Sequence, residues 1–327
     1  MNNQVMQCFG LAKSFGNVPF LETEAVKQQI INIKFAIATG GIIALTGMVG
    51  TGKTTLLWKI QQQLLDEKQI IVCRSLSTDK KRVTIATLYT ALFLDLAREA
   101  KDKNFKVPTQ SEERERKLME LVKKQDKPIA LFIDEAHDLD NKTLIALKRL
   151  TELFYHNGTS IAVILAGHPK LGNDLKRSTM EEIGARAQVF GLDHWADNKV
   201  QYISWLLKQC SASKDFDQAD FITLEAMELL VNNLVTPLQI NHYLTQAMEQ
   251  AYLSGIKPIS LEIIQSVLMP DIDSMEAKLV RYGYNTQALC ELLNTRPSEV
   301  KAYLSGQLNN QSKLLEFNKE IYKLGVI

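Results

Sequence analysis

An apolar run that leads into a glycine-rich loop constrains this 327-residue chain more than any other feature. The run is Ile42-Ile43-Ala44-Leu45, the loop reads Gly47-Met48-Val49-Gly50-Thr51-Gly52-Lys53-Thr54, and a helix-compatible stretch follows from Thr55 to Leu65. A strand, such a loop and a helix, in this order, are typical of a nucleotide-binding P-loop. We therefore predict an α/β fold with a parallel sheet that binds ATP or GTP.

The loop residues suit a nucleoside triphosphate. Backbone N–H groups of the loop and of the following helix N-terminus point inward and solvate phosphate. Lys53 is expected to reach the β and γ phosphates, and the Thr54 hydroxyl is expected to bind Mg²⁺. A chance glycine-rich loop is the opposing interpretation, and the preceding strand weakens it.

Two adjacent carboxylates end a second apolar run, Ile129 to Ile133. A buried parallel strand would deliver Asp134 and Glu135 to the carboxyl edge of the sheet, where α/β folds place their chemistry. We expect Asp134 to hold Mg²⁺ and Glu135 to polarise the attacking water. GTPases of the Ras type position that water with glutamine, so the pair favours ATP hydrolysis. An acidic helix cap remains the alternative.

The predicted nucleotide-binding set combines both motifs. It consists of Gly47, Val49, Gly50, Thr51, Gly52, Lys53, Thr54, Thr55 and Asp134, with Thr54 and Asp134 as the Mg²⁺ ligands. A third apolar run, from Ser160 to Ala166, ends in Gly167-His168. A polar side chain after this strand would lie between the γ-phosphate and the water, a place called sensor 1. His168 is the predicted residue, and the alternative is a turn histidine that caps the next helix.

The order of elements divides the chain into three parts. Strands alternate with helices up to Phe190, which indicates a three-layer P-loop core over residues 1–192. Only helical patterns follow, and we expect an α-helical lid over 193–270 and a small helical tail over 271–327. Three short helices are expected in the tail, at Ser274–Tyr282, Asn285–Leu293 and Pro297–Leu304. Their spacing resembles a helix-turn-helix, and a partner-docking bundle is the open alternative.

Composition limits the partners and the compartment. A net charge of +1 excludes a uniformly basic nucleic-acid coat, so any DNA contact must come from a local cluster. The cysteines lie far apart without a C-x-x-C pair, which argues against a zinc site or a disulfide framework and fits a reducing cytosol. We find no basic n-region and no apolar span of membrane length, and we expect a cytoplasmic protein without membrane contact. The four cysteines are Cys8, Cys73, Cys210 and Cys290.

The motifs together resemble an AAA+ ATPase. Four sequence segments are similar to the ExeA-like branch, which includes the transposition ATPases MuB, TniB and TnsC. They are Thr46 to Thr55, Cys73-Arg74-Ser75-Leu76-Ser77, Phe132 to His137 and Ala166-Gly167-His168-Pro169. The resemblance covers most of residues 1–270. It implies ATP-dependent rings or helical filaments on double-stranded DNA that mark target sites, work with target-selection proteins and stimulate a DDE-type transposase.

The resemblance also assigns further residues. An arginine between the sensor strand and the last core strand would act in trans on a neighbouring subunit's γ-phosphate; the candidates are Arg186 and Arg177. The cluster Lys80-Lys81-Arg82, with Thr84, would face the pore and contact DNA phosphates; a solvated basic turn is the alternative. Family lids often carry a sensor 2 arginine, whereas this chain has Thr236-Pro237-Leu238-Gln239. Slow, timer-like turnover is therefore expected. Gln239 could substitute weakly by hydrogen bonding, but a surface residue at a helix N-terminus is the favoured interpretation.

Two classes of function remain after this comparison. The first is an ATP-dependent regulator of DNA transposition that assembles on target DNA. The second is a nucleotide-gated scaffold ATPase in secretion or signalling, with no DNA role. Secretion relatives carry a transmembrane helix after the ATPase module, and none is readable here. The letters Asp134-Glu135-Ala136-His137 are those of DEAH helicases, but no second helicase lobe follows, so we assign roles only to the two acids.

Overall fold

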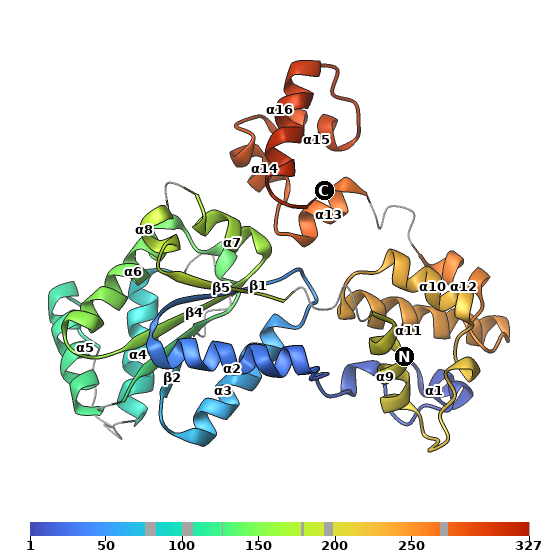
Figure 1. Ribbon diagram of the computed structural model, residues 1–327, viewed down its shortest axis with the longest axis horizontal. Coiled ribbons are helices and arrows are strands. Elements are labelled where there is room, and N and C mark those ends of the chain that lie inside the picture. Colours follow the sequence, from blue (N-terminus) through green and yellow to red (C-terminus); the bar gives the residue numbers. More distant parts are fainter. Residues whose placement is uncertain are drawn as a thin grey trace. The chain divides into compact units, whose positions relative to one another are not determined.

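The computed structural model places most of the chain in two compact units (Figure 1). The sheet unit contains Glu24–Gly47 and Lys53–Leu192, and the helical unit contains Met1–Thr23, Met48–Gly52 and Asp193–Ile327. The described residues are 1–75, 83–99, 107–125, 127–177, 180–192, 199–268 and 274–326.

Five parallel strands form the centre of the sheet unit, in the spatial order β2-β3-β4-β1-β5. Thr46, at the end of β1, pairs with Gly167 at the end of β4, so both strands finish at the same edge. The inner strands β1, β3 and β4 are buried almost throughout, which explains why their sequences are continuous apolar runs and do not alternate. The strands are β1 (Gly41–Thr46), β2 (Ile71–Arg74), β3 (Ile129–Ile133), β4 (Ile161–Gly167) and β5 (Ala187–Gly191).

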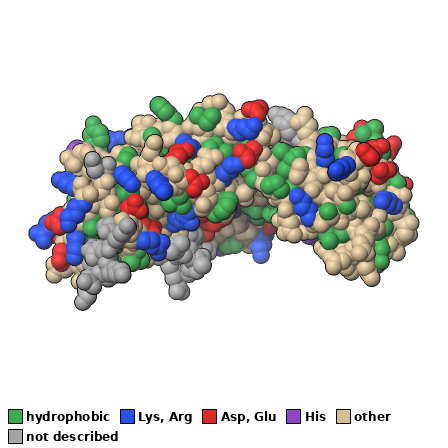
Figure 2. Space-filling view, turned by 90° about the horizontal axis from the view of Figure 1, so that it is seen from below, with side chains coloured by type: hydrophobic (Ala, Val, Ile, Leu, Met, Phe, Trp, Pro, Cys, Tyr) green, Lys and Arg blue, Asp and Glu red, His purple; other side chains and the backbone are tan. Residues whose placement is uncertain are grey.

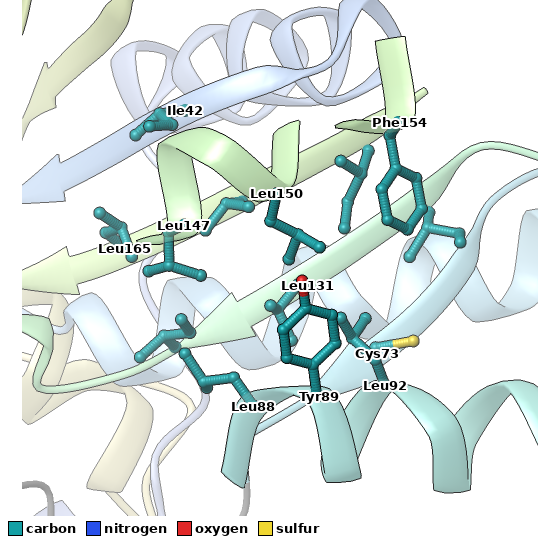
Figure 3. Close-up of a cluster of buried hydrophobic side chains, with 14 of the residues drawn as sticks. Ile42, Cys73, Leu88, Tyr89, Leu92, Leu131, Leu147, Leu150, Phe154 and Leu165 are labelled. Carbon is teal, nitrogen blue, oxygen red and sulfur yellow. The ribbon is translucent and has the colours of Figure 1, made fainter. Parts of the chain in front are cut away.

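Helices cover the sheet on both faces and make the predicted three-layer arrangement (Figure 1). One face packs against α4, α5 and α6, where Leu92, Leu131 and Leu147 have no exposed surface (Figure 3). The opposite face meets α2 and α3. The helices of this unit are α2 (Glu24–Thr39), α3 (Lys53–Glu67), α4 (Ile85–Glu99), α5 (Ser111–Gln125), α6 (Asn141–His156), α7 (Pro169–Leu175) and α8 (Glu181–Gly184).

The helical unit includes the first residues of the chain, which the sequence analysis assigns to the ATPase core. Val5, Phe9 and Phe15 pack into the same apolar cluster as α9, α10 and α11. The bundle consists of α1 (Asn3–Phe9), α9 (Lys199–Cys210), α10 (Leu224–Asn233), α11 (Pro237–Ser254) and α12 (Leu261–Val267).

The tail has a small core of its own, in which Tyr284 and Val300 are fully buried. It contains α13 (Met275–Arg281), α14 (Thr286–Leu292) and α15 (Pro297–Leu304), close to the three expected helices. A further helix, α16 (Gln311–Tyr322), was not expected. Its Phe317 and Ile321, four residues apart, pack into the tail core, so a helical period was present in the sequence. Among the described residues, no helix is long and apolar enough to cross a membrane.

Candidate nucleotide-hydrolysis site

Lys53 lies at the first turn of α3, directly after the glycine-rich loop. Its ammonium donates a hydrogen bond of 2.8 Å to the carbonyl of Gly47, which directly follows β1. Lys53 itself is only 6% exposed. Burial lowers the Lys53 pKa, and the negative charges of Glu135 and Asp134 partly oppose this shift. The lysine is therefore held close to both carboxylates that the sequence analysis selects.

Thr54 and Asp134 meet across the carboxyl edge of the sheet. The Thr54 hydroxyl donates to Asp134 Oδ2 at 2.8 Å, although 80 residues separate them in the chain. This contact forms because α3 starts after β1 and Asp134 follows β3, and parallel strands finish at one edge. A hydroxyl and a carboxylate oxygen are hard ligands of the kind that Mg²⁺ prefers, so the predicted pair fits that ion.

Glu135 has a left-handed backbone, with φ 54° and ψ 37°. Such a conformation in a residue with a side chain costs on the order of 1–3 kcal/mol and is typical of functional sites. Asp134 holds the turn, because its Oδ1 accepts a 2.9 Å hydrogen bond from the Glu135 N–H. The turn ends β3 sharply and leads into the short 3-10 helix η3 (Ala136–Asp138).

His168 follows β4 and packs face to face on His137. The ring centroids are 3.7 Å apart and the planes are inclined by 17°. His168 occupies the N-cap position of α7 without a side-chain capping bond, so the alternative role of helix cap is not the one it takes. Its Nε2 lies 3.9 Å from Glu135 Oε2. The predicted sensor residue thus lies beside the predicted water-polarising carboxylate.

Sequence reasoning left His137 without a role, and the structure places it in the same cluster. Its Nδ1 is 3.3 Å from Glu135 Oε2, but the two are not aligned as a hydrogen bond. Gly167 leaves room for this close approach, since a Cβ on it would lie only 3.1 Å from the His137 backbone nitrogen. Only the adjacency of β3 and β4 reveals this pair, because 31 residues separate the two histidines in the sequence.

Both histidines are held neutral near pH 7. Burial lowers the pKa of His168 to about 3, and repulsion from a protonated His137 and from the charges of Lys53 and Lys170 would act in the same direction. Burial also lowers the His137 pKa, while the carboxylates of Asp138 and Glu135 oppose the shift. A neutral imidazole offers both a donor and an acceptor, which suits a residue that orients water.

The middle of the loop, Met48–Gly52, groups with the helical unit. Gly50 and Gly52 have positive φ values of 86° and 91°, as the close curl of a phosphate-binding loop requires. The Leu238 N–H, at the start of α11, donates to the Gly50 carbonyl at 3.3 Å. Gln239 completes a capping box, since its side-chain oxygen accepts from the Val235 and Thr236 N–H groups at 2.9 and 3.2 Å.

The remaining predicted nucleotide-binding positions lie in the glycine-rich loop and at the start of α3. Val49 and Thr55 are exposed, whereas Thr51 is 1% exposed and its hydroxyl donates to the Met48 carbonyl at 2.9 Å. Thr51 therefore stabilises the loop through its side chain. Its backbone N–H also donates within the loop, to the same carbonyl, at 3.3 Å.

The two candidate arginines form ion pairs with acidic residues of the sheet unit. Arg186 immediately precedes β5, at the amino edge of the sheet, and its side chain is 62% exposed in an ion pair with Glu152. Arg177 pairs with Asp174, three residues earlier, at 3.2 Å. These ion pairs do not test whether either arginine acts in trans.

Most of the predicted DNA-contacting cluster, Lys80, Lys81 and Arg82, lies outside the described residues. Thr84 is described and exposed, and its hydroxyl accepts from the Thr87 N–H at 3.4 Å just before α4. On the face that Figure 2 shows, Lys and Arg side chains intermix with Asp and Glu, in agreement with the net charge of +1.

Comparisons with known proteins agree with this geometry. Residues 37–175 match the family model described as the AAA domain. The fold is a P-loop AAA+ fold. Cdc6p from Pyrobaculum aerophilum is similar over 99% of this chain and 90% of its own, with 17% identity and a TM-score of 0.53. No curated protein sequence matches the chain.

Two further solved structures have the same AAA+ architecture. The ORC2 protein of Aeropyrum pernix, in ADPNP and ADP complexes, has a TM-score of 0.55 and 12% identity, covering 99% of this chain and 90% of its own. A Drosophila ORC structure bound to DNA has a TM-score of 0.52 and 13% identity, covering 97% of this chain and 82% of its own. At these identities the likeness is one of fold.

Proposed function

We propose that this chain binds ATP with Mg²⁺ and hydrolyses it to ADP and phosphate. The convergence of Lys53, Thr54, Asp134 and Glu135 at one edge of the sheet carries this proposal. These side chains come from two separate strand-to-helix junctions. A carboxylate positioned beside a metal-binding pair and a phosphate-binding lysine is the arrangement that phosphoryl transfer to water requires.

The residues divide the work between binding and chemistry. The loop N–H groups and Lys53 bind and neutralise phosphate oxygens, and Thr54 and Asp134 would hold Mg²⁺, which would spread the charge of the triphosphate. Glu135 orients and polarises the attacking water. His168, neutral and 3.9 Å from Glu135 Oε2, assists that orientation. The left-handed turn at Glu135 keeps its carboxylate beside His168 and His137.

We further propose that nucleotide controls assembly on double-stranded DNA, and that the assembly recruits or activates a transposase with its target-selection partners. The resemblance of the ATPase motifs to MuB, TniB and TnsC supports this, and so does a similar structure that is bound to DNA. Arg186, exposed at the amino edge, supports self-assembly because it is available to a neighbouring subunit. In this proposal the protein is a cytoplasmic switch, and its ATP-dependent assembly controls where a mobile element inserts.

Duplex binding by the purified full chain tests the DNA role. With ATP and Mg²⁺, duplexes of unrelated sequence should bind alike and show rings or filaments by negative stain, whereas ADP should abolish both. Lack of binding even at low salt, alongside normal ATP hydrolysis, would favour the scaffold alternative. ATP turnover is measured separately, so failure of the DNA role leaves the proposed hydrolysis testable.

Replacing Lys80, Lys81 and Arg82 by alanine tests the basic cluster. Affinity for all duplexes should fall, and each lost phosphate contact should reduce the log–log salt slope by about 0.9. Alanine at Lys117, Lys123 and Lys124 of α5 removes the same charge elsewhere and is the matched control. An unchanged affinity and salt slope in the first variant would place the DNA surface elsewhere, with the tail as the next region to test.

A further inference from the structure

Glu135, His137 and His168 form a cluster with the composition of a transition-metal site. One ligand atom from each residue lies within 4.8 Å of the others. Glu135 Oε2 is 3.3 Å from His137 Nδ1 and 3.9 Å from His168 Nε2. Tetrahedral Zn²⁺ with bonds of about 2.0–2.1 Å separates its ligand atoms by about 3.3–3.4 Å, which is close to the spacing of these three atoms.

Backbone structure fixes the three residues together. Glu135 and His137 lie on one tight turn that begins with the left-handed conformation of Glu135. His168 follows the neighbouring strand β4, and Gly167 lets the two turns approach closely. His137 Nδ1 is buried without a hydrogen-bond partner among the described residues, although it lies next to the Glu135 carboxylate. A ligand atom that faces a carboxylate without bonding to it is suited to share an ion with it.

The surroundings contain charges of both signs. Asp138 lies 3.9 Å from His137 Nε2 and favours a cation. Lys53 and Lys170 oppose one, but Lys170 is paired with Asp174 at 2.5 Å and Lys53 with the Gly47 carbonyl. The stacked rings must also splay apart to direct two lone pairs at one ion. The repulsion by the two lysines and the separation of the rings both weaken cation binding. We therefore expect a site of moderate affinity that binds the ion reversibly.

We propose that Glu135, His137 and His168 bind Zn²⁺ and that the bound ion inhibits ATP hydrolysis. Two imidazoles and a carboxylate are ligands that Zn²⁺ prefers, unlike the oxygen pair Thr54 and Asp134 assigned to Mg²⁺. The wide spacing of the cysteines argued against a zinc site, but that argument concerned thiol ligands only and this proposed site uses none. Inhibition rests on the proposed role of Glu135, because a carboxylate engaged by a metal cannot polarise water; binding does not rest on it.

Co²⁺ titration of the nucleotide-free full chain tests binding, since four-coordinate Co²⁺ absorbs visible light more strongly than the hydrated ion. We expect one Co²⁺ ion per chain to bind with intense visible absorption. The Co²⁺ affinity should fall at least tenfold in His137→Ala and in His168→Ala. His156→Ala, which removes an exposed histidine of the same unit, is the matched control. The proposal would be overturned if both cluster variants bound Co²⁺ with the affinity of the parent chain. A thiolate charge-transfer band in the parent chain would overturn it as well.

A gain-of-signal variant keeps the test independent of misfolding. His168→Cys retains a ligand and should add a thiolate charge-transfer band to the Co²⁺ spectrum, with circular dichroism used to check the fold. A folded His168→Cys chain that binds Co²⁺ without this band would exclude residue 168 as a ligand and overturn the site.

ATP turnover at buffered free Zn²⁺ tests inhibition. Turnover should fall at least tenfold as the site fills, and His137→Asn should shift the inhibition to at least tenfold higher Zn²⁺. Histidine-dependent Co²⁺ binding with unchanged turnover at saturating Zn²⁺ would overturn inhibition alone. Full turnover in Glu135→Gln would instead overturn the proposed role of Glu135, while the Co²⁺ results would still decide the metal site.

Discussion

The carboxyl and amino edges of the same parallel sheet hold different parts of one proposed reaction. At the carboxyl edge, Lys53, Thr54 and Asp134 contact one another or the strand ends within a single chain. At the amino edge, Arg186 and Glu152 border an open cavity of about 600 Å³ beside Gly40 and Gly41. Contacts within one chain bring the first edge together, whereas Arg186 pairs only with Glu152 among the described residues. Under the proposal that Arg186 acts in trans, hydrolysis would need the carboxyl edge of one subunit and the amino edge of another.

Lys53→Ala should have the largest effect, because it removes the principal cation from the carboxyl edge. We expect ATP binding measured by calorimetry to weaken by at least tenfold, with loss of ATP-dependent assembly. Lys142→Ala, at an exposed lysine on α6, is the matched control. ATP affinity that stays at the parent level would show that phosphate is bound elsewhere.

Arg186→Ala tests the amino edge. The variant should bind ATP normally as a monomer but hydrolyse it on the order of 10³-fold more slowly, as expected for loss of an arginine finger. Mixing it with Glu135→Gln should restore part of the turnover, because some junctions then pair an intact Glu135 with an intact Arg186. Confirmed co-assembly on DNA without any recovery would count against Arg186, and Arg177 would become the candidate to test.

Glu135→Gln separates binding from chemistry at the carboxyl edge. Turnover should fall about 10²-fold or more, the usual contribution of a positioned base, while nucleotide and Mg²⁺ binding persist through Lys53, Thr54 and Asp134. Assemblies on DNA should consequently be longer-lived with ATP. Glu181→Gln, on the exposed surface of α8, provides the control. Near-normal turnover in Glu135→Gln would remove Glu135 from the proposed role.

The smallest effect concerns the pH dependence of stability. The His168 pKa is about 3 in the folded chain against 6.5 ordinarily, so the unfolded chain binds more protons between these values. Above about pH 6.5, His168 is neutral in both states and does not change the free energy of unfolding. As pH falls from 6.5 toward 3, its protonation in the unfolded chain lowers that free energy. Urea unfolding of His168→Asn should lose less stability between pH 7 and pH 5 than the parent does. Identical losses would contradict the buried, neutral state of His168; His156→Asn is the control.

Local sequence was sufficient for the sheet and for the glycine-rich loop. Strands β1, β3 and β4 are apolar throughout because both faces are covered, and such runs are visible without any knowledge of the fold. The positive φ values of Gly50 and Gly52 follow from the same local chemistry. These strands were predicted, with ends that agree to within one residue.

Long-range packing decided the features that the sequence analysis did not anticipate. The stacking of His137 on His168 depends on β3 lying beside β4 and on the absence of a side chain at Gly167. The placement of Phe9 and Phe15 in the helical unit depends on contacts with helices about 200 residues away. Apolar periodicity shows that a side chain is buried but not which partner buries it. Partner choice is a property of the whole fold, because it is set by the complementarity of distant surfaces.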